Sequence, residues 1–450
     1  MNDRSAHKEA WHLAWPLILS NITVPLLGMV DTAVVGHLPG PHHLGAVALG
    51  ASAFNALFFT VVSLRMGTTG LIAQAFGAGD RVEIEAVLLR ALALAILLAG
   101  LMILLTTPII DAANWIFSPT ERVSEGLEIY LKIRLYAAPA ALANMVVLGW
   151  LLGMQDARSP LYLMILGNGL NMALDVLFVF GFGWEVAGVA FATVIAEYAS
   201  LALGAWLVWR RLGGFQGGLG IKGIMAWRAI RRLIAVNRDI VLRSLTLQVA
   251  FVSLAALGSR QGEVVLAANT VLAQMNYLSA FALDGFAFAA STLVGRHAGA
   301  RDRPAMRAAV IAGLHWSLVF ALAITLIFAF GGGILIAVIT DIEAVRATAL
   351  VFLPYAVVSP LIGAVAFLFD GVYIGATRTA EMRNGMVVAV IMFGAVAWLL
   401  MPLLGNHGLW LAYLVFMIVR GLWLGIVYWR LEAGAGFMNP ASPSAADRSA

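Results

Sequence analysis

The sequence contains no cysteine, which excludes disulfides, thiolate nucleophiles and thiolate metal sites. It is also poor in charge, because only 12% of its residues are Asp, Glu, Lys or Arg, against about 25% in soluble domains. Hydrophobic residues make up 62% of the chain, and the mean hydropathy is +0.91. This composition indicates a polytopic membrane protein whose surroundings are the lipid bilayer.

The small excess of basic residues does not indicate nucleic-acid binding. The formal net charge is +4, and basic loops of a membrane protein usually mark its cytoplasmic side. Most Lys and Arg residues fall at the same ends of the expected spans, which predicts that both termini are cytoplasmic and that no nucleic acid is bound.

Hydrophobic segments of about 20 residues are long enough to cross a bilayer as helices. The N-terminal residues 1–15 lack the short apolar stretch and cleavage site of a signal peptide, so the first segment is expected to be a retained span. Twelve spans are predicted, at residues 12–37, 44–76, 85–109, 127–153, 160–182, 187–210, 236–258, 264–295, 306–330, 346–375, 385–404 and 407–429.

The two halves of the chain resemble each other. Gln74–Arg81 (QAFGAGDR) matches Arg296–Arg303 (RHAGARDR) at corresponding places of the two halves. Six spans in each half give both repeats the same orientation, and transporters built this way bind substrate between the repeats. The predicted organisation is an N-terminal lobe, a cytoplasmic linker with a short amphipathic helix, a C-terminal lobe and a disordered tail, at residues 1–211, 212–235, 236–431 and 432–450.

The first span contains a carboxylate, Asp31, and two prolines, Pro16 and Pro25. A charged residue at the centre of a membrane helix costs about 2.5–3.5 kcal/mol on insertion scales. Asp31 is therefore either a solvated residue near the helix end or a residue that handles an ion.

Other polar residues lie at a similar depth of the first half. Asn171 precedes Asp175 by one helical turn, and Thr193 lies about as deep in the next span. If the helices are neighbours, these side chains and Asp31 converge. Two close carboxylates can take up and release a proton near neutral pH, and the same four residues could bind Na⁺. Helix packing is the alternative role, chiefly for Thr193. No other metal site and no cofactor is predicted.

The second half has its own ionisable candidates, Asp284, Asp370 and Arg420, nearer the middle of the membrane. A structural salt bridge between Arg420 and one aspartate explains them at least as well as a substrate role does. In the first half, Arg65 is expected to be a structural or gating residue, and the sequence suggests no partner for Glu197.

Four segments carry a resemblance to a known family. They are MVDTAVVGHL (29–38), LRMGTTGLIAQAFGAGD (64–80), ALDGFAFAASTLVGRHAGARD (282–302) and DGVYIGATRTAEMRN (370–384). Together with the twelve-span, two-repeat layout, they resemble the MATE (multidrug and toxic compound extrusion) transporters, most closely the DinF subfamily.

The resemblance implies an all-α, V-shaped membrane protein with two pseudo-symmetric six-helix lobes. It implies that Asp31 is central to cation coupling and that Pro16 bends the first helix. The polar cluster of the family's first lobe matches Asn171, Asp175 and Thr193, together with Asn144, and the acid of helix ten matches Asp370. The chain departs from relatives that carry acids in helices seven and eight, where it has Gln248 and Ser291.

The function expected from these observations is secondary active export of amphiphilic, often cationic compounds across the bacterial inner membrane. The coupling ion is expected to be H⁺, with Na⁺ as the alternative, and loading at Asp31 and Asp175 would bend the first helix at Pro16 or Pro25. The protein is expected to be a monomer. A flippase for lipid-linked substrates is the nearest alternative. A channel and an intramembrane enzyme are disfavoured, because the sequence shows neither a symmetric filter segment nor a catalytic constellation.

Overall fold

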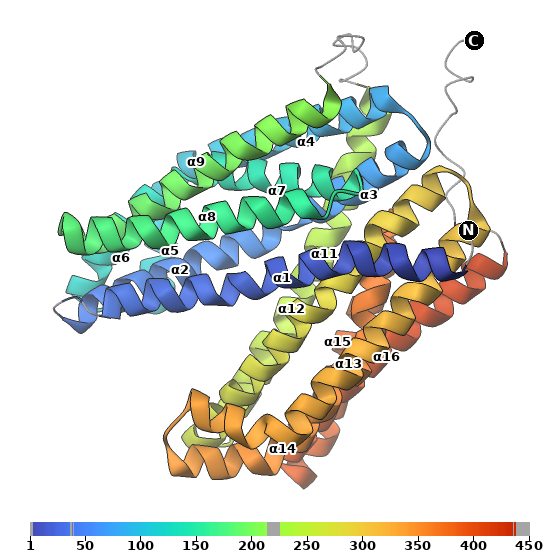
Figure 1. Cartoon of the computed structure of the whole chain (residues 1–450). Coiled ribbons are helices and arrows are strands. Elements are labelled where there is room, and N and C mark those ends of the chain that lie inside the picture. The colour runs from blue at the N-terminus through green and yellow to red at the C-terminus, as the bar shows by residue number, and fades with distance from the viewer. Residues whose placement is uncertain (1–2, 37, 39, 214–225, 435, 438–450) are drawn as a thin grey trace. The chain divides into compact units, whose positions relative to one another are not determined.

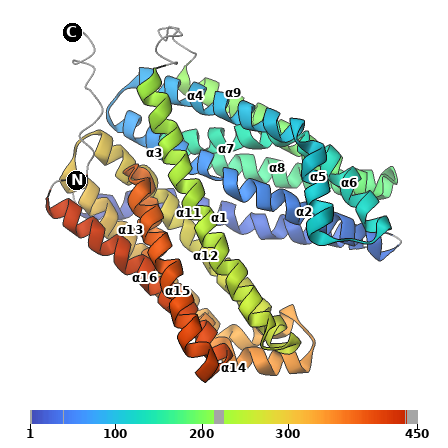
Figure 2. The same ribbon diagram turned by 180° about the vertical axis from the view of Figure 1, so that it is seen from behind.

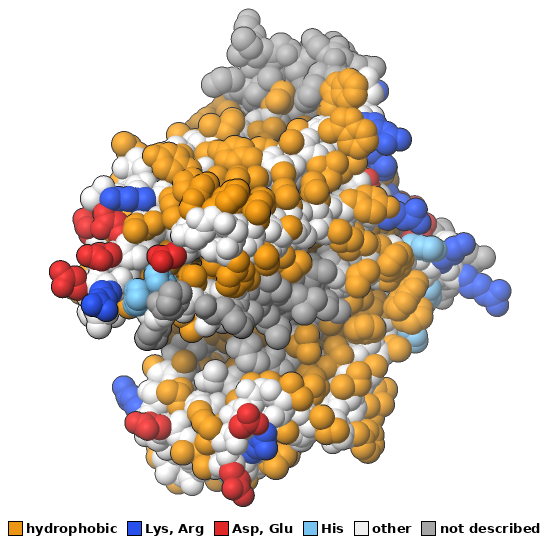
Figure 3. Space-filling view, turned by 60° about the vertical axis from the view of Figure 1, so that its left-hand side comes forward, with side chains coloured by type: hydrophobic (Ala, Val, Ile, Leu, Met, Phe, Trp, Pro, Cys, Tyr) orange, Lys and Arg blue, Asp and Glu red, His pale blue; other side chains and the backbone are white. Residues whose placement is uncertain are grey.

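The computed structural model describes residues 3–36, 38, 40–213, 226–434, 436 and 437, except for the side chains of residues 3, 22–33, 41, 59 and 60. Across these residues the chain is helical, as a bilayer requires, because a helix satisfies its backbone polar groups without water. The predicted all-α architecture is therefore confirmed for the described part of the chain. Figure 3 shows hydrophobic side chains over most of the visible face, with charged side chains gathered toward its margins.

The helices of the first half are α1 (Asp3–Gly36), α2 (Pro41–Val61), α3 (Ser63–Gly77), α4 (Arg81–Leu104), α5 (Thr106–Phe117), α6 (Glu121–Leu135), α7 (Ala138–Gly153), α8 (Arg158–Val176), the π-helix η1 (Leu177–Gly181) and α9 (Glu185–Leu212) (Figure 1). Those of the second half are α11 (Trp227–Ser259), α12 (Glu263–Gly299), α13 (Arg303–Ile339), α14 (Glu343–Gly375), α15 (Thr379–Leu404) and α16 (Asn406–Ala433) (Figure 2).

Ten helical segments of the described chain are long and apolar enough to cross a membrane, or eleven if α6 and α7 form one span. The pair α6 and α7 is bent by 51° in the middle of the predicted span 127–153. Pro139, in the first turn of α7, lacks the N–H that would continue the helix. Helix α1 is 34 residues long, and the side chains of its residues 22–33 lie outside the described part of the chain.

The chain forms two compact units, which we call unit 1 and unit 2. Unit 1 comprises Met1–Ile18, Ala73–Asp80 and Ala235–Ala450, and unit 2 comprises Leu19–Ile72 and Arg81–Ile234. The helices α1, α3 and α11 therefore contribute residues to both units. In unit 2 the most extensive helix contacts are α8 with α9 and α2 with α6, and in unit 1 they are α12 with α14 and α15 with α16.

The segment predicted to be a linker, residues 212–235, is mostly helical where the structure describes it. Residues 214–225 lie outside the described part, and α11 runs without interruption from Trp227 into the seventh span. Within the described part of the chain, the short helix expected in the linker forms the first turns of α11 and is continuous with the span that follows.

The segment predicted to be a disordered tail begins with folded residues. Phe437 is 1% exposed and packs on the rings of Tyr373 and Tyr428, with centroid distances of 5.4 and 4.8 Å. Arg378 donates hydrogen bonds to the carbonyl oxygens of Gly436 and Phe437. Only residues 438–450 of this predicted tail, together with 435, lie outside the described part.

The repeated sequence segments pack against each other inside unit 1. A Cβ atom on Gly77, at the end of α3, would lie 1.8 Å from the carbonyl oxygen of Arg296. A Cβ atom on Gly299, at the corresponding place of α12, would lie 1.9 Å from the carbonyl oxygen of Gln74. The two segments therefore cross backbone to backbone, which small residues permit at membrane helix interfaces.

The same junction includes α14. Gln74 donates hydrogen bonds to the carbonyl oxygen of Gly375 (3.0 Å) and to the hydroxyl of Thr377 (3.2 Å). Gly371 and Gly375 form a G-x-x-x-G motif on α14, and a Cβ on Gly371 would lie 1.9 Å from the carbonyl oxygen of Ala287 on α12. These approaches explain why the contact between α12 and α14 is so extensive.

We expect Gly299→Ala to destabilise the protein by about 1–3 kcal/mol, because the added methyl group meets a backbone carbonyl that cannot move away cheaply. The matched control is Gly394→Ala on α15, where a Cβ would have no neighbour within 4 Å. Alanine also has the better helix propensity at such a position. Thermal unfolding of the two purified variants in the same detergent tests this, and equal melting temperatures would show that the junction tolerates a side chain.

Candidate functional site

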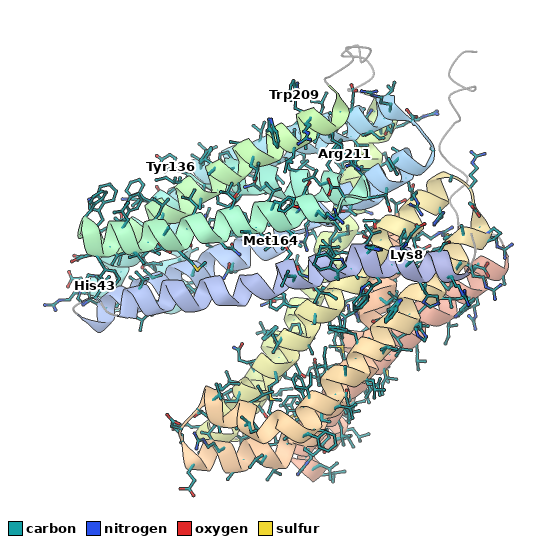
Figure 4. All side chains as sticks on the ribbon, in the orientation of Figure 1. Lys8, His43, Tyr136, Met164, Trp209 and Arg211 are labelled. Atoms are coloured by element: carbon teal, nitrogen blue, oxygen red, sulfur yellow. The ribbon has the colours of Figure 1, made fainter. Side chains whose placement is uncertain are left out.

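Unit 2 contains a polar cavity of about 200 Å³ between α3, α7, α8 and α9. Its walls are formed by Arg65, Asn144, Leu148, Leu163, Met164, Gly167, Asn168, Asn171, Thr193, Ala196, Glu197 and Ser200. Figure 4 marks Met164 on α8, and Trp209 and Arg211 near the end of the neighbouring α9. A Cβ on Gly167 would lie 2.6 Å from the Ser200 hydroxyl, so this glycine lets α8 and α9 approach closely beside the cavity.

A carboxylate and an amide meet on one wall of the cavity. The Asn144 side-chain nitrogen donates hydrogen bonds to the Glu197 carboxylate and to the Glu197 backbone carbonyl, each at 2.9 Å. The amide on α7 therefore fixes the position of the carboxylate on α9. The sequence had suggested Asn144 only through the family resemblance and had offered no partner for Glu197, which the structure now supplies.

A second polar pair lies on the same cavity. Asn171 on α8 donates a hydrogen bond to the Thr193 hydroxyl at 3.1 Å, and Thr193 donates in turn to the carbonyl oxygen of Val189 at 3.0 Å. The structure thus brings together two residues that the sequence placed at one depth. The bond to Val189 lies within one turn of α9, so the threonine contributes to helix packing as well as to the wall.

Asp175 occupies a different environment from Glu197. Its side chain is completely buried, with 0% exposure, and it is not among the residues that line the cavity. It lies one residue before α8 gives way to the π-helix η1. Asp175 is therefore enclosed by protein, one helical turn after Asn171 on α8.

The candidates on the first helix are described only in part. Pro16 is buried within α1, two residues before the point where α1 passes from unit 1 to unit 2. The side chains of Pro25 and Asp31 lie outside the described part of the chain, although the backbone there is helical. The predicted Na⁺ site includes Asp31, so its geometry lies outside the described part as well.

Arg65 also lines the cavity in unit 2. Its backbone carbonyl accepts a hydrogen bond from the Thr69 hydroxyl at 2.8 Å. A Cβ on Gly149 would lie 2.5 Å from the same carbonyl oxygen, so α3 and α7 touch at this point. The guanidinium and Glu197 are the charged groups among the lining residues.

In unit 1 the structure gathers a buried charge cluster. Asp370 on α14 accepts hydrogen bonds from Arg420 on α16 and from Arg243 on α11, all three side chains being buried. Asp284 on α12 is half-buried and interacts electrostatically with Arg243. The salt bridge between Arg420 and an aspartate, which the sequence left as one of two alternatives, is present.

Sequence reasoning did not assign a role to Arg243. The signal was present, because Arg243 is an arginine within a largely apolar helix and such residues usually pair with another charge. Its partner is 127 residues away in the sequence, so no local pattern could identify it. Among the residues that the structure describes, no group of three or more His, Asp or Glu side chains could hold a metal ion.

The comparisons with known proteins agree with this architecture. A family model named MatE matches residues 16–177 and 240–403. The chain is 46% identical over 427 residues to DNA damage-inducible protein F of Escherichia coli strain K12, covering 95% of this chain and 92% of that protein. It is 27% identical over 327 residues to a probable multidrug resistance protein NorM of Thermotoga maritima, covering 71% and 69% of the two chains.

Solved structures are similar along almost the whole length. One, described as the outward-facing conformation of a multidrug resistance MATE family transporter, matches with a TM-score of 0.87 and 21% identity over 96% of each chain. Another, described as MATE in complex with MaD3S, matches with a TM-score of 0.86. At this identity the likeness concerns the fold, and it confirms the predicted MATE-like helical architecture. Because the family model matches both halves and a 46% identical relative aligns with 95% of its residues, the chain belongs to the MatE family of membrane transporters.

Proposed function

We propose that this protein is a secondary active multidrug exporter that moves amphiphilic, often cationic compounds by cation antiport and alternating access. The observation that carries this proposal is the cavity of unit 2, where a carboxylate, a guanidinium, amides and hydroxyls line a space inside a bundle of membrane-spanning helices. Intramembrane polar groups of this kind mark substrate and ion pathways. The names of the relatives, probable multidrug resistance proteins among them, support the same substrate class.

Within this function we assign different tasks to the two carboxylates of unit 2. Glu197 lines the cavity and is held by Asn144, so it can contact the positive group of a bound compound. Asp175 is fully enclosed, so it suits a small ion rather than a drug. Together with Asp31, Asn171 and Thr193, it forms the proposed coupling site.

The coupling ion that we favour is the proton, because a buried carboxylate beside a second one readily takes up a proton. Na⁺ bound by the oxygens of Asp31, Asn171, Asp175 and Thr193 is the alternative. Loading of the ion removes charge repulsion and lets α1 bend at Pro16 or Pro25. The support for bending is that α1 is one continuous helix whose residues belong to both compact units, with Pro16 next to the change.

The protein is proposed to act as a monomer in the inner membrane with both termini in the cytoplasm. The support for this orientation is the uneven distribution of Lys and Arg between the two sides of the spans. Its direct partners are then the bilayer and the exported small molecules.

The coupling proposal is tested by dye efflux from proteoliposomes in which a pH gradient and a Na⁺ gradient are imposed separately. We expect the pH gradient alone to drive export by the wild type and Asp31→Asn to abolish it, because the amide cannot load a proton. Export driven only by Na⁺ would identify the cluster as a sodium site. If neither gradient moves a cationic dye, lipid-linked substrates replace drugs as the hypothesis.

The division of labour between the carboxylates predicts two different phenotypes. Glu197→Gln is expected to weaken binding of trimethyl(2-naphthylmethyl)ammonium about tenfold, or about 1.4 kcal/mol, because the cation loses its counter-charge. Asp175→Asn is expected to leave binding within about twofold and to lower export driven by the pH gradient. The control is Glu263→Gln, at the exposed start of α12, and a larger binding defect in Asp175→Asn than in Glu197→Gln would reverse the assignment.

For unit 1 we propose that Asp370 is a structural counter-ion for Arg243 and Arg420 and does not load cations. Removing one member of a buried charge cluster costs about 3–5 kcal/mol, whereas apolar replacement of a whole cluster is often neutral. We therefore expect Asp370→Asn to lower the melting temperature strongly. The triple variant Arg243→Met, Asp370→Leu, Arg420→Met should restore stability and export, and a stable but inactive triple variant would contradict the structural role.

A further inference from the structure

Unit 1 contains a second cavity, of about 210 Å³, between α11, α12, α14 and α16. A cavity of about 150 Å³ is large enough for benzene, so this one has room for one or two fused rings. Five aromatic side chains line it: Phe251, Tyr277, Phe367, Trp410 and Tyr413. Flat apolar walls of this kind suit an aromatic ligand, which packs against ring faces and edges.

The polar groups of this cavity are neutral, since its lining residues include no Asp, Glu, Lys, Arg or His. Asn269 is already satisfied, because its amide exchanges two hydrogen bonds with Asn406 and accepts a third from the Trp410 indole. Asn276 accepts a hydrogen bond from the Ser359 hydroxyl.

Within the described part of the chain, hydrogen-bond donors remain available on this wall. The amide nitrogen of Asn276 has no partner, and neither has the side chain of Gln274 or the hydroxyl of Tyr277. Asn276 is half-buried, whereas Gln274 and Tyr277 are exposed, so the Asn276 donor is the one that gains most from a complementary partner. A ligand that presents an acceptor oxygen to this wall would therefore satisfy donors that the protein leaves open.

The charges behind the wall disfavour a cationic ligand. The Arg420 guanidinium lies 5.2 Å from the centre of the Phe367 ring, and its Nη1 lies 4.0 Å from the sulfur of Met417, and both of these residues line the cavity. Arg420 and Arg243 share the carboxylate of Asp370, and Arg243 also interacts with Asp284. The charge cluster behind this cavity therefore has no excess negative charge and presents an arginine to the wall, whereas the cavity of unit 2 is lined by a carboxylate, Glu197, together with Arg65.

We propose that the cavity of unit 1 binds uncharged aromatic compounds that carry a hydrogen-bond acceptor, separately from cations bound in unit 2. The ligand stacks among Phe251, Phe367 and Trp410, and its acceptor atom receives a hydrogen bond from Asn276. The assignment rests on this cavity alone and does not depend on the coupling ion or on transport.

The test is equilibrium binding of tritiated 2-acetylnaphthalene, an uncharged aromatic ketone, to the full chain in lipid nanodiscs. The permanently charged counterpart is trimethyl(2-naphthylmethyl)ammonium, which has the same ring system. We expect Ala280→Phe, which fills the cavity, to weaken ketone binding at least tenfold and to leave binding of the ammonium compound within twofold. The control is Ala323→Phe on an exposed face of α13, which should change neither.

A second variant separates loss of the site from loss of the fold. Asn276→Leu keeps the volume and removes the donor, so it should weaken the ketone several-fold and leave 2-methylnaphthalene, which has no acceptor, unchanged. Excess ammonium compound should not displace the ketone from the wild type. Displacement of this kind, or ketone binding that is equal in the wild type and a correctly folded Ala280→Phe variant, would overturn the proposal.

Discussion

Hydrocarbon offers no hydrogen-bond partner, so polar side chains inside the membrane-spanning helices gain from partners within the protein, and this constraint shapes both units. In unit 2 it pairs Asn144 with Glu197 and Asn171 with Thr193. In unit 1 it places Asp370 between Arg243 and Arg420. Each of these groups joins two or three different helices, so the same contacts satisfy polar side chains and hold the helices together.

Such pairing works only where helices come close, and glycine makes that approach possible. Gly167 lets α8 meet α9 beside the polar cavity, and Gly149 lets α7 meet α3 at Arg65. In unit 1, Gly77 and Gly299 lack a Cβ, which allows the two repeated segments to cross with each glycine against a backbone carbonyl of the other segment. The repeat therefore has a direct physical role in the fold, because each copy supplies a glycine that allows the backbone of the other copy to approach closely.

The cavities of the two units differ in the charge and type of the side chains that line them, although both lie between four helices. In unit 2, Glu197 lines the cavity, whereas Asp175 is completely buried and does not line it. In unit 1 the carboxylate of Asp370 is neutralised by arginines, and the remaining lining is aromatic and amide.

The sequence by itself determined the membrane environment, the helical class, the repeat and the family, because these depend on composition, on periodicity and on segments that are continuous in the chain. It also singled out Asp175, Asn171 and Thr193 as candidate site residues, since intramembrane polar residues stand out against an apolar background. Only the tertiary structure decided which carboxylate faces the cavity, that Glu197 is held by Asn144, and that Arg243 shares Asp370 with Arg420. These contacts join residues 50 or more positions apart, and helix rotation and packing, which no single segment encodes, set them.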